Sequence, residues 1–250
     1  RAGFSTKLAT ASSSESWFHP VALLGENKRA SIMIFNPTDL VADVEVTVVS
    51  DEGKGESVVT SVGSYDVTEV QVLPKEEEKL VANRLFTSLE SFGIIVETSD
   101  GVPIVSGIEL TSGPKGSPGK ESPEQELLPI SEGEEELRLP VGRNSGLSLT
   151  TGAPSGSRDW LLVLPDVPGE VLVAIENIGS SKVSASVIRY GKRQRYEVKL
   201  ASFATEHLRI AGGTTIEVNS DSEVVVSAIH QEPKGAGLSS ISGIKFAGGS

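Results

Sequence analysis

The residue types best suited to binding chemistry are concentrated in the segment 189–196. It holds four cationic side chains and two tyrosines, whereas the whole chain has a formal net charge of −12. Arginine forms bidentate contacts with phosphate or carboxylate groups, and a tyrosine ring can stack on a bound group. We interpret the segment as a candidate binding hairpin; the alternative is a solvated turn contacted by the Glu-rich segment of the same chain. The candidate binding residues are Arg189, Tyr190, Lys192, Arg193, Arg195 and Tyr196.

The usual catalytic patterns are missing from the sequence. The histidines His19, His207 and His230 are far apart and form no HExxH pattern. Residues 152–156, Gly-Ala-Pro-Ser-Gly, do not match the Gly-x-Ser-x-Gly turn, and no phosphate-binding glycine loop occurs. We therefore predict no catalytic residue and a non-enzymatic protein. The alternative is a hydrolase with an unrecognised site, which needs a cleft holding His207 or His230 beside a carboxylate or a serine.

Three acidic clusters, at residues 51–52, 76–78 and 134–136, raise the question of calcium. Calcium requires six to eight oxygen ligands that converge from a shaped loop, and the EF-hand spacing is absent. Runs of consecutive glutamates are more typical of a solvated surface. We predict no metal site and no cofactor.

Trp17 and Trp160 are the natural candidates for a sugar-stacking platform. They follow similar Ser-rich segments, Ser-Ser-Ser-Glu-Ser and Ser-Gly-Ser-Arg-Asp. A position that recurs within one chain is most simply explained by a packing requirement, so we predict that both side chains are packed in a core or at a strand end. The alternative is a carbohydrate-binding module that uses exposed aromatic residues.

Composition restricts the classes of partner. An acidic chain with a pI of about 4.8 lacks the charge needed to neutralise phosphates, which disfavours nucleic acid. The absence of cysteine excludes disulfides and thiol nucleophiles. No apolar run approaches the ~18 residues of a membrane span. The chain begins at Arg1, which we interpret as a processed or trimmed segment with any anchor upstream.

The chain also repeats itself. Three sequence matches occur in the same order, and the separation between partners falls from 143 to 141 to 121 residues. This pattern indicates one duplicated module whose second copy is shorter. The matching pairs are Trp17 with Trp160, residues 31–37 with 172–178, and residues 98–108 with 219–229.

Alternating apolar residues predict strands throughout both copies. Residues 42–48 and 183–187 alternate with period two, which places one face in a core and the other in water. Ser99-Asp100-Gly101 predicts a hairpin between two apolar runs. Residues 80–89 are the one helix candidate. The Gly/Ser-rich tail contains Ile241, Ile244 and Phe246, which could add a last strand to either module.

These signals predict an all-β fold of two tandem immunoglobulin-like antiparallel β-sandwich modules from an internal duplication. Module 1 covers residues 1–112 and module 2 residues 140–250. Residues 113–139 form an acidic linker, of which 113–136 contain seven Glu and two Lys. Such a segment has little apolar surface to bury and repels itself.

Residues 12–48 combine a Ser-rich segment, Trp17, an apolar strand ending in Asn36-Pro37 and an alternating valine strand. This order resembles uncharacterised secreted or membrane-anchored proteins of actinobacteria built from paired immunoglobulin-like modules. Residues 155–188 repeat it, with Ile178 in place of the proline. The resemblance implies an envelope location and no known activity.

We therefore expect a non-enzymatic, extracellular or cell-envelope protein that binds or scaffolds a macromolecular partner. The partner is a protein or an anionic envelope polymer, and not nucleic acid. Contact with a membrane is expected only through an anchor upstream of Arg1. The sequence specifies neither the partner nor the oligomeric state.

Overall fold

The computed structural model describes residues 3–6, 13–23, 28–74, 84–112, 146–167, 169–192, 194–231 and 238–245. These residues form eighteen strands and no helix, which confirms the prediction of an all-β fold. No helix of the described ranges is therefore long and apolar enough to cross a membrane. The strands make three sheets.

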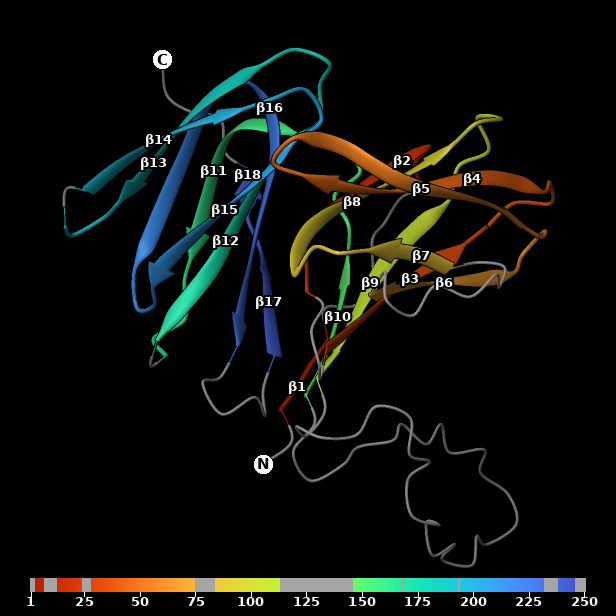
Figure 1. The fold of residues 1–250 in the computed structure, drawn as a ribbon, viewed down its shortest axis with the longest axis horizontal. Helices are drawn as coiled ribbons and strands as arrows, with labels where there is room; N and C mark the ends of the chain where they lie inside the picture. The colour runs from red at the N-terminus through yellow and green to blue at the C-terminus, as the bar shows by residue number, and fades with distance from the viewer. Residues whose placement is uncertain are drawn as a thin grey trace, which may run out of the picture.

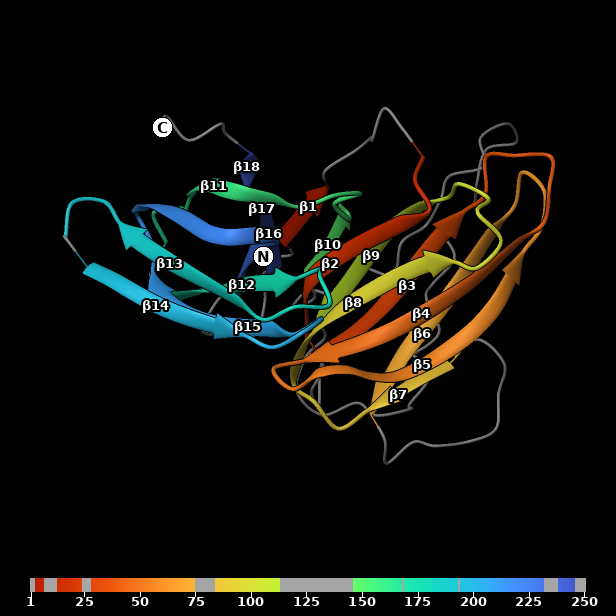
Figure 2. The same cartoon turned by 90° about the horizontal axis from the view of Figure 1, so that it is seen from above.

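Two sheets, built from the first half of the chain together with strand β10, pack face to face (Figures 1 and 2). The four-stranded sheet has the order β2 (Ser16–Leu23), β8 (Ser91–Thr98), β4 (Ala42–Ser50), β5 (Gly53–Val62). The six-stranded sheet has the order β1 (Gly3–Thr6), β10 (Gly146–Thr151), β9 (Val105–Ser112), β3 (Lys28–Phe35), β6 (Val67–Pro74), β7 (Arg84–Thr87).

The core between these sheets follows from the alternation seen in the sequence. Val44, Val46 and Val48 of β4 are buried, as are Ile32 and Ile34 of β3. Each fully buried aliphatic side chain of this kind stabilises the fold by roughly 1.5–3 kcal/mol. The inward faces of the two sheets therefore supply most of the stability of the first module.

Two local predictions for this module are wrong. Residues 84–87 of the proposed helix form strand β7, which pairs in parallel with β6; residues 80–83 lie outside the described residues. Ser99-Asp100-Gly101 does not close a hairpin, because β8 pairs with β2 and β4 whereas β9 pairs with β3 and β10. The turn carries the chain from one sheet to the other.

The second half of the chain forms one eight-stranded sheet that folds over its own core. Its longest strand, β16, pairs near its start with β11 and β13 and near its end with β12 and β17, so that it belongs to both layers. Its strands are β11 (Ser157–Val163), β12 (Glu170–Asn177), β13 (Val183–Arg189), β14 (Gln194–Leu200), β15 (Thr205–Ala211), β16 (Thr215–Gln231), β17 (Leu238–Ser242) and β18 (Ile244–Lys245).

One strand departs from a simple tandem arrangement, and the tail strands follow it. Strand β10 lies in the range expected for module 2 but pairs with β9 of the first half. The tail residues Ile241 and Ile244 lie in β17 and β18, which join the second-half sheet through β16 and β11, as the last-strand prediction allowed.

The two halves use the same side-chain hydrogen bonds at matching positions. Trp17 Nε1 donates to the Ile104 carbonyl and Trp160 Nε1 to the Val224 carbonyl, both at 2.8 Å. Because a buried indole N–H needs an acceptor, these bonds explain why both positions carry tryptophan.

Asn36 and Asn177 repeat a second arrangement. Each side-chain amide donates to two carbonyls, those of Leu40 and Val62 in the first half and of Ser181 and Ala201 in the second, at 2.6–3.1 Å. Each side-chain oxygen accepts the backbone N–H two residues later. A buried asparagine thus joins two loops at the same end of each half.

Candidate functional site

The basic segment 189–196 forms the β13–β14 hairpin, as expected, with Arg189 opposite Gln194. The hairpin lies at one end of the long axis of the molecule, at the left in Figure 1. Its turn contains Gly191 at φ 80°, a conformation that favours glycine. The six predicted residues do not form one surface, because alternate residues of a strand point to opposite faces.

The inner face of the hairpin carries Arg189 and Tyr196. Arg189 is only 9% exposed, and its Nη1 donates to Gln194 Oε1 at 3.4 Å. Tyr196 lies opposite Val187 and is about a third exposed. Arg189 is therefore poorly placed to contact a partner.

On the outer face, two glutamates contact the predicted binding residues. Arg195 Nε and Glu197 Oε1 form an exposed ion pair at 2.6 Å. The Tyr190 hydroxyl donates to Glu217, and this hydrogen bond raises the pKa of Tyr190. Lys192 in the turn is exposed, and Arg193 lies outside the described residues. Of the predicted residues that the structure describes, Lys192 and Tyr190 are thus the best presented to a partner.

Both tryptophans are packed in cores, as predicted. Trp17 is 0% and Trp160 2% exposed, so neither ring can serve as a stacking platform for a sugar. Lys245 lies 5.6 Å from the centre of the Trp160 ring and covers its edge.

His19 and His230 are buried and His207 is partly exposed, and no hydrogen bond joins any of the three to a carboxylate among the described residues. His19 Nε2 is hydrogen-bonded to Ser106 Oγ at 2.9 Å, and burial lowers the pKa of His19 to about 3. Burial also lowers the pKa of His207 to about 4, and the Nε2 atoms of His207 and His230 are buried without a described partner. A Ser–His pair held inside a core, with no carboxylate of the described residues bonded to the imidazole, lacks the access and orientation that nucleophilic catalysis needs.

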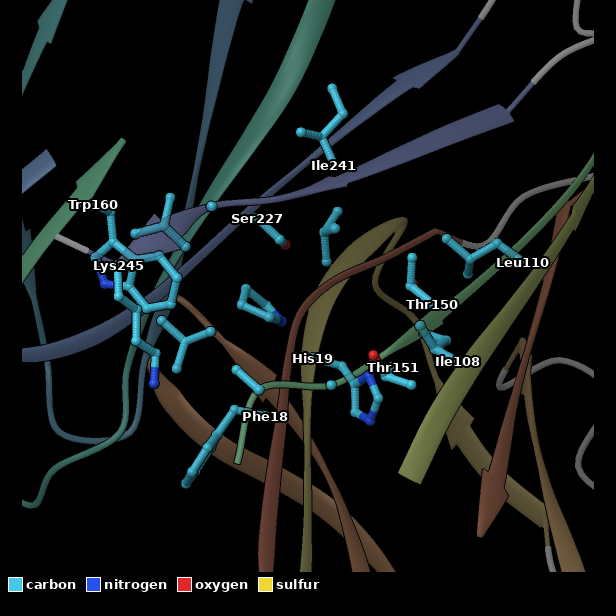
Figure 3. Close-up of a pocket in the computed structure, with 17 residues that line it drawn as sticks. Phe18, His19, Ile108, Leu110, Thr150, Thr151, Trp160, Ser227, Ile241 and Lys245 are labelled. Atoms are coloured by element: carbon cyan, nitrogen blue, oxygen red, sulfur yellow. The ribbon is translucent and has the colours of Figure 1, made fainter. Parts of the chain in front are cut away.

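A cavity of about 170 Å³ lies between the first-half strands β2, β9 and β10 and the second-half strands β11 and β16–β18 (Figure 3). Its polar lining includes His19, Thr150, Ser227 and Lys245. Lys245 Nζ is occupied by hydrogen bonds to the carbonyl and hydroxyl of Ser155 at 2.8 and 2.6 Å. No carboxylate is among the residues that line it, so the cavity offers no acid–base pair.

The two halves meet in a joint that buries polar groups. Glu176 of β12 is 0% exposed, and both carboxylate oxygens lack a hydrogen-bond partner in the described part of the chain. Burial raises its pKa well above the usual range, and the charge of Lys54 opposes this shift only in part. A β-carbon on Gly93 would lie 2.5 Å from Thr205 Oγ1, so glycine is required for this close approach.

The outer part of the joint is a contact between a loop and a hairpin. Phe203, in the loop between β14 and β15, has Lys54 Nζ 4.6 Å from its ring centre. Lys54 also forms a 2.7 Å ion pair with Glu97. A β-carbon at Gly53 would lie 2.9 Å from the Ser202 carbonyl oxygen. The β4–β5 hairpin of the first half therefore supports the end loops of the second half.

The matching end of the first half is exposed. Five of its large apolar side chains are between 38% and 67% exposed, an unusual concentration at one end of a module. We call this surface the tip; its apolar residues are Phe35, Leu40, Val41, Tyr65 and Val67.

No family model matches the chain, and no curated protein matches it. Sequence reasoning found the basic hairpin but missed both the joint and the tip. The tip had one local signal: Leu40 and Val41 are consecutive apolar residues in the turn after Asn36-Pro37. The joint had none, because Glu176 in an alternating strand reads as a solvent-facing residue.

Proposed function

We propose that the chain is a non-enzymatic scaffolding or binding protein of the cell envelope. It consists of two immunoglobulin-like modules that arose by tandem duplication, and it presents the two ends of an elongated body to a macromolecular partner. The partner is a protein or an anionic envelope polymer.

The duplication is supported by hydrogen bonds that recur at matching positions. The bonds of Trp17 and Asn36 correspond to those of Trp160 and Asn177. Asp100 and Asp221 each accept a backbone N–H from near the start of an equivalent strand. The donors are Asp43 in β4, at 2.9 Å, and Ser184 in β13, at 3.0 Å. Three side-chain arrangements retained in the same order favour descent from one module.

One observation supports the scaffolding role: the titratable side chains suited to catalysis are largely buried, whereas apolar and cationic side chains are exposed at the two ends. Of the groups most suited to acid–base work, His19 and Glu176 are buried and His207 is partly buried. The apolar tip and the exposed Lys192 lie on the outside. Surfaces of this kind suit contact with large partners better than conversion of small substrates.

Co-sedimentation with insoluble bacterial cell-wall material tests this proposal. We expect retention that fades between roughly 50 and 300 mM salt, because exposed charge pairs are screened over this range. The double variant K192E/R195E should reduce retention several-fold. The control K182E/K199E makes the same change of charge at the opposite end of the same two strands.

Equal retention of the two double variants would show that the hairpin is not the contact. A chain that is not retained at any salt, and that captures no envelope protein, would overturn the scaffolding proposal. Salt-insensitive retention would instead point to a shape-based site away from the hairpin.

A further inference from the structure

The joint inside the chain provides a template for a contact between chains. Phe203 and Tyr65 are equivalent residues: both have a positive φ, 50° and 53°, although neither is glycine. Each donates its backbone N–H to a carbonyl of the loop that follows the buried asparagine, Phe203 to Gly179 at 3.0 Å and Tyr65 to Thr38 at 3.1 Å. The two aromatic rings therefore project from the same place on each half.

Each of the two hairpins also has a lysine directly after a glycine. The hairpins differ in length, because β4 and β5 pair up to Ser50 and Gly53 with a bulge between Thr47 and Val49, whereas β13 and β14 pair only up to Arg189 and Gln194. In the strand ladders Val62 lies opposite Ala42 and Leu200 opposite Val183, which matches β5 with β14 at a separation of 138 residues. The same separation relates Gly53-Lys54 to Gly191-Lys192, and Tyr65 to Phe203. Gly53 and Gly191 both have positive φ values, 118° and 80°.

One lysine–aromatic pair of this kind already forms a contact within the chain. Lys54 lies over Phe203, and the loop of the second half packs on the hairpin of the first. The matching aromatic residue, Tyr65, is 67% exposed, and the matching lysine, Lys192, is exposed as well. In the described part of the chain, neither Tyr65 nor Lys192 has the cation–ring contact that Phe203 and Lys54 form with each other.

The two exposed ends are complementary in charge. The tip loops 36–43, 63–67 and 99–104 contain Asp39, Asp43, Asp66 and Asp100 but no Lys or Arg. The hairpin 189–195 contains four cations and no acid. Arg189 is buried and Arg195 is paired with Glu197, so Lys192 is the cation of its described residues that is left to face the acidic tip. Complementary charges favour association and orient it.

From this equivalence we infer that the tip of one copy of this chain binds the β13–β14 hairpin of a second copy, with Tyr65 packed under Lys192. This contact names the partner for the proposed scaffolding function and rests on it. The hairpin and the tip lie at opposite ends of the long axis (Figures 1 and 2). A contact between two different surfaces at opposite ends does not close as a two-fold dimer, so the copies join head to tail in a row.

The contact between copies is weaker than the joint. Thr215 occupies, in the second half, the place that Gly93 has in the first. Gly93 lies opposite Val49 at the end of β4, and Thr215 accepts a hydrogen bond from Tyr190 just after β13. The sheet face cannot approach as closely there as it does at Gly93 and Thr205. The interface is therefore limited to loops and hairpin, which is typical of small, transient interfaces.

Sedimentation velocity of the full chain, without any other partner, tests the inference. In about 50 mM salt we expect the mean sedimentation coefficient to rise between about 10 µM and about 500 µM protein, and to rise less at about 500 mM salt. Y65N removes the ring while asparagine tolerates the positive φ. Y65N and K192E should each weaken association at least tenfold.

Matched controls keep the test specific. V59N changes an apolar side chain that is also 67% exposed but lies on β5, and K199E reverses a charge at the other end of β14. Both should associate like the unmodified chain. Circular dichroism of each variant checks that the strands are retained.

Mixing the two defective variants gives the decisive result. Y65N retains an intact hairpin and K192E an intact tip, so an equimolar mixture should form dimers that grow no further. Absence of association in the unmodified chain, or equal loss in V59N and K199E, would overturn the inference. Failure to recover dimers in the mixture would exclude the head-to-tail contact.

The outcome also separates this inference from the scaffolding proposal. A chain that stays monomeric yet is retained on cell-wall material would overturn self-association and leave the proposed function intact. A chain that neither associates nor is retained, and captures no envelope protein, would overturn both.

Discussion

The two modules place opposite kinds of residue at one equivalent position. Phe35 and Glu176 each precede the buried asparagine of their half, yet Phe35 is 38% exposed and Glu176 is 0% exposed. The asparagine hydrogen bonds beside them are the same. The difference teaches that the framework of the module sets the backbone, whereas the neighbouring module decides which side chains are covered.

The same contrast applies one loop away. Phe203 and Tyr65 share a strained backbone conformation, but only Phe203 is packed, beneath Lys54. A left-handed conformation costs a residue with a β-carbon about 1 kcal/mol. The second module offsets this cost with packing, and the first does not do so within the chain.

The largest expected loss of stability tests whether the two buried tryptophans contribute equally to the two halves. W17A and W160A should each destabilise by about 4 kcal/mol, because each removes a fully buried side chain and leaves a cavity. Urea unfolding followed by far-UV circular dichroism measures the loss. If one variant lost less than about 1 kcal/mol, the two tryptophans would not play equivalent roles.

Acid should act on the joint and its surroundings. The pKa values of His19 and His207 are lowered by burial to about 3 and about 4, so the unfolded chain binds their protons first as the pH falls below 6.5. Stability should therefore decrease from pH 7 to pH 5, by about 2 kcal/mol for His19 and by less for the partly exposed His207. Urea titrations across this range give the slope.

The variants H19Q and H207Q separate the two contributions. Each should flatten part of the pH dependence between 5 and 7. A slope that is unchanged in both variants would mean that neither imidazole is held neutral by the fold.

Glu176 should contribute in the opposite direction. Its pKa is raised by burial, so its carboxyl favours folding when protonated, and that contribution is lost as the pH rises above the ordinary value. E176Q should raise stability at pH 7 by about 1 kcal/mol and have less effect near pH 5. E170Q, on an exposed position of the same strand, is the control. A destabilising E176Q would indicate that the carboxylate is ionised and partnered.

The smallest expected change in stability should differ in sign between Tyr65 of the tip and Phe203 of the second half. Y65G relieves a left-handed conformation at an exposed site, so we expect a gain of up to about 0.5 kcal/mol. F203G relieves the same conformation but removes a packed ring, and should lose about 1 kcal/mol or more. Thermal unfolding of both variants decides the matter. A loss in Y65G equal to that in F203G would show that the ring of Tyr65 is already packed in solution.

Much of the fold could be predicted because period-two alternation reflects a sheet with one face in a core. The valines of residues 42–48 and the core position of both tryptophans follow from this rule. The hairpin at 189–196 was also found, since local chain reversal depends on local residues. The predicted hairpin at Asp100 failed because a turn signal does not specify which strands pair.

Sequence alone determined the all-β class, most of the alternating strands and the charge of the β13–β14 hairpin, since each depends on neighbouring residues. Only the tertiary structure decided that Glu176 is buried, that β10 pairs with β9 and that Tyr65 remains exposed while Phe203 is covered. These outcomes depend on how two finished sheets pack against each other. Packing between distant segments leaves no periodic signal along the chain.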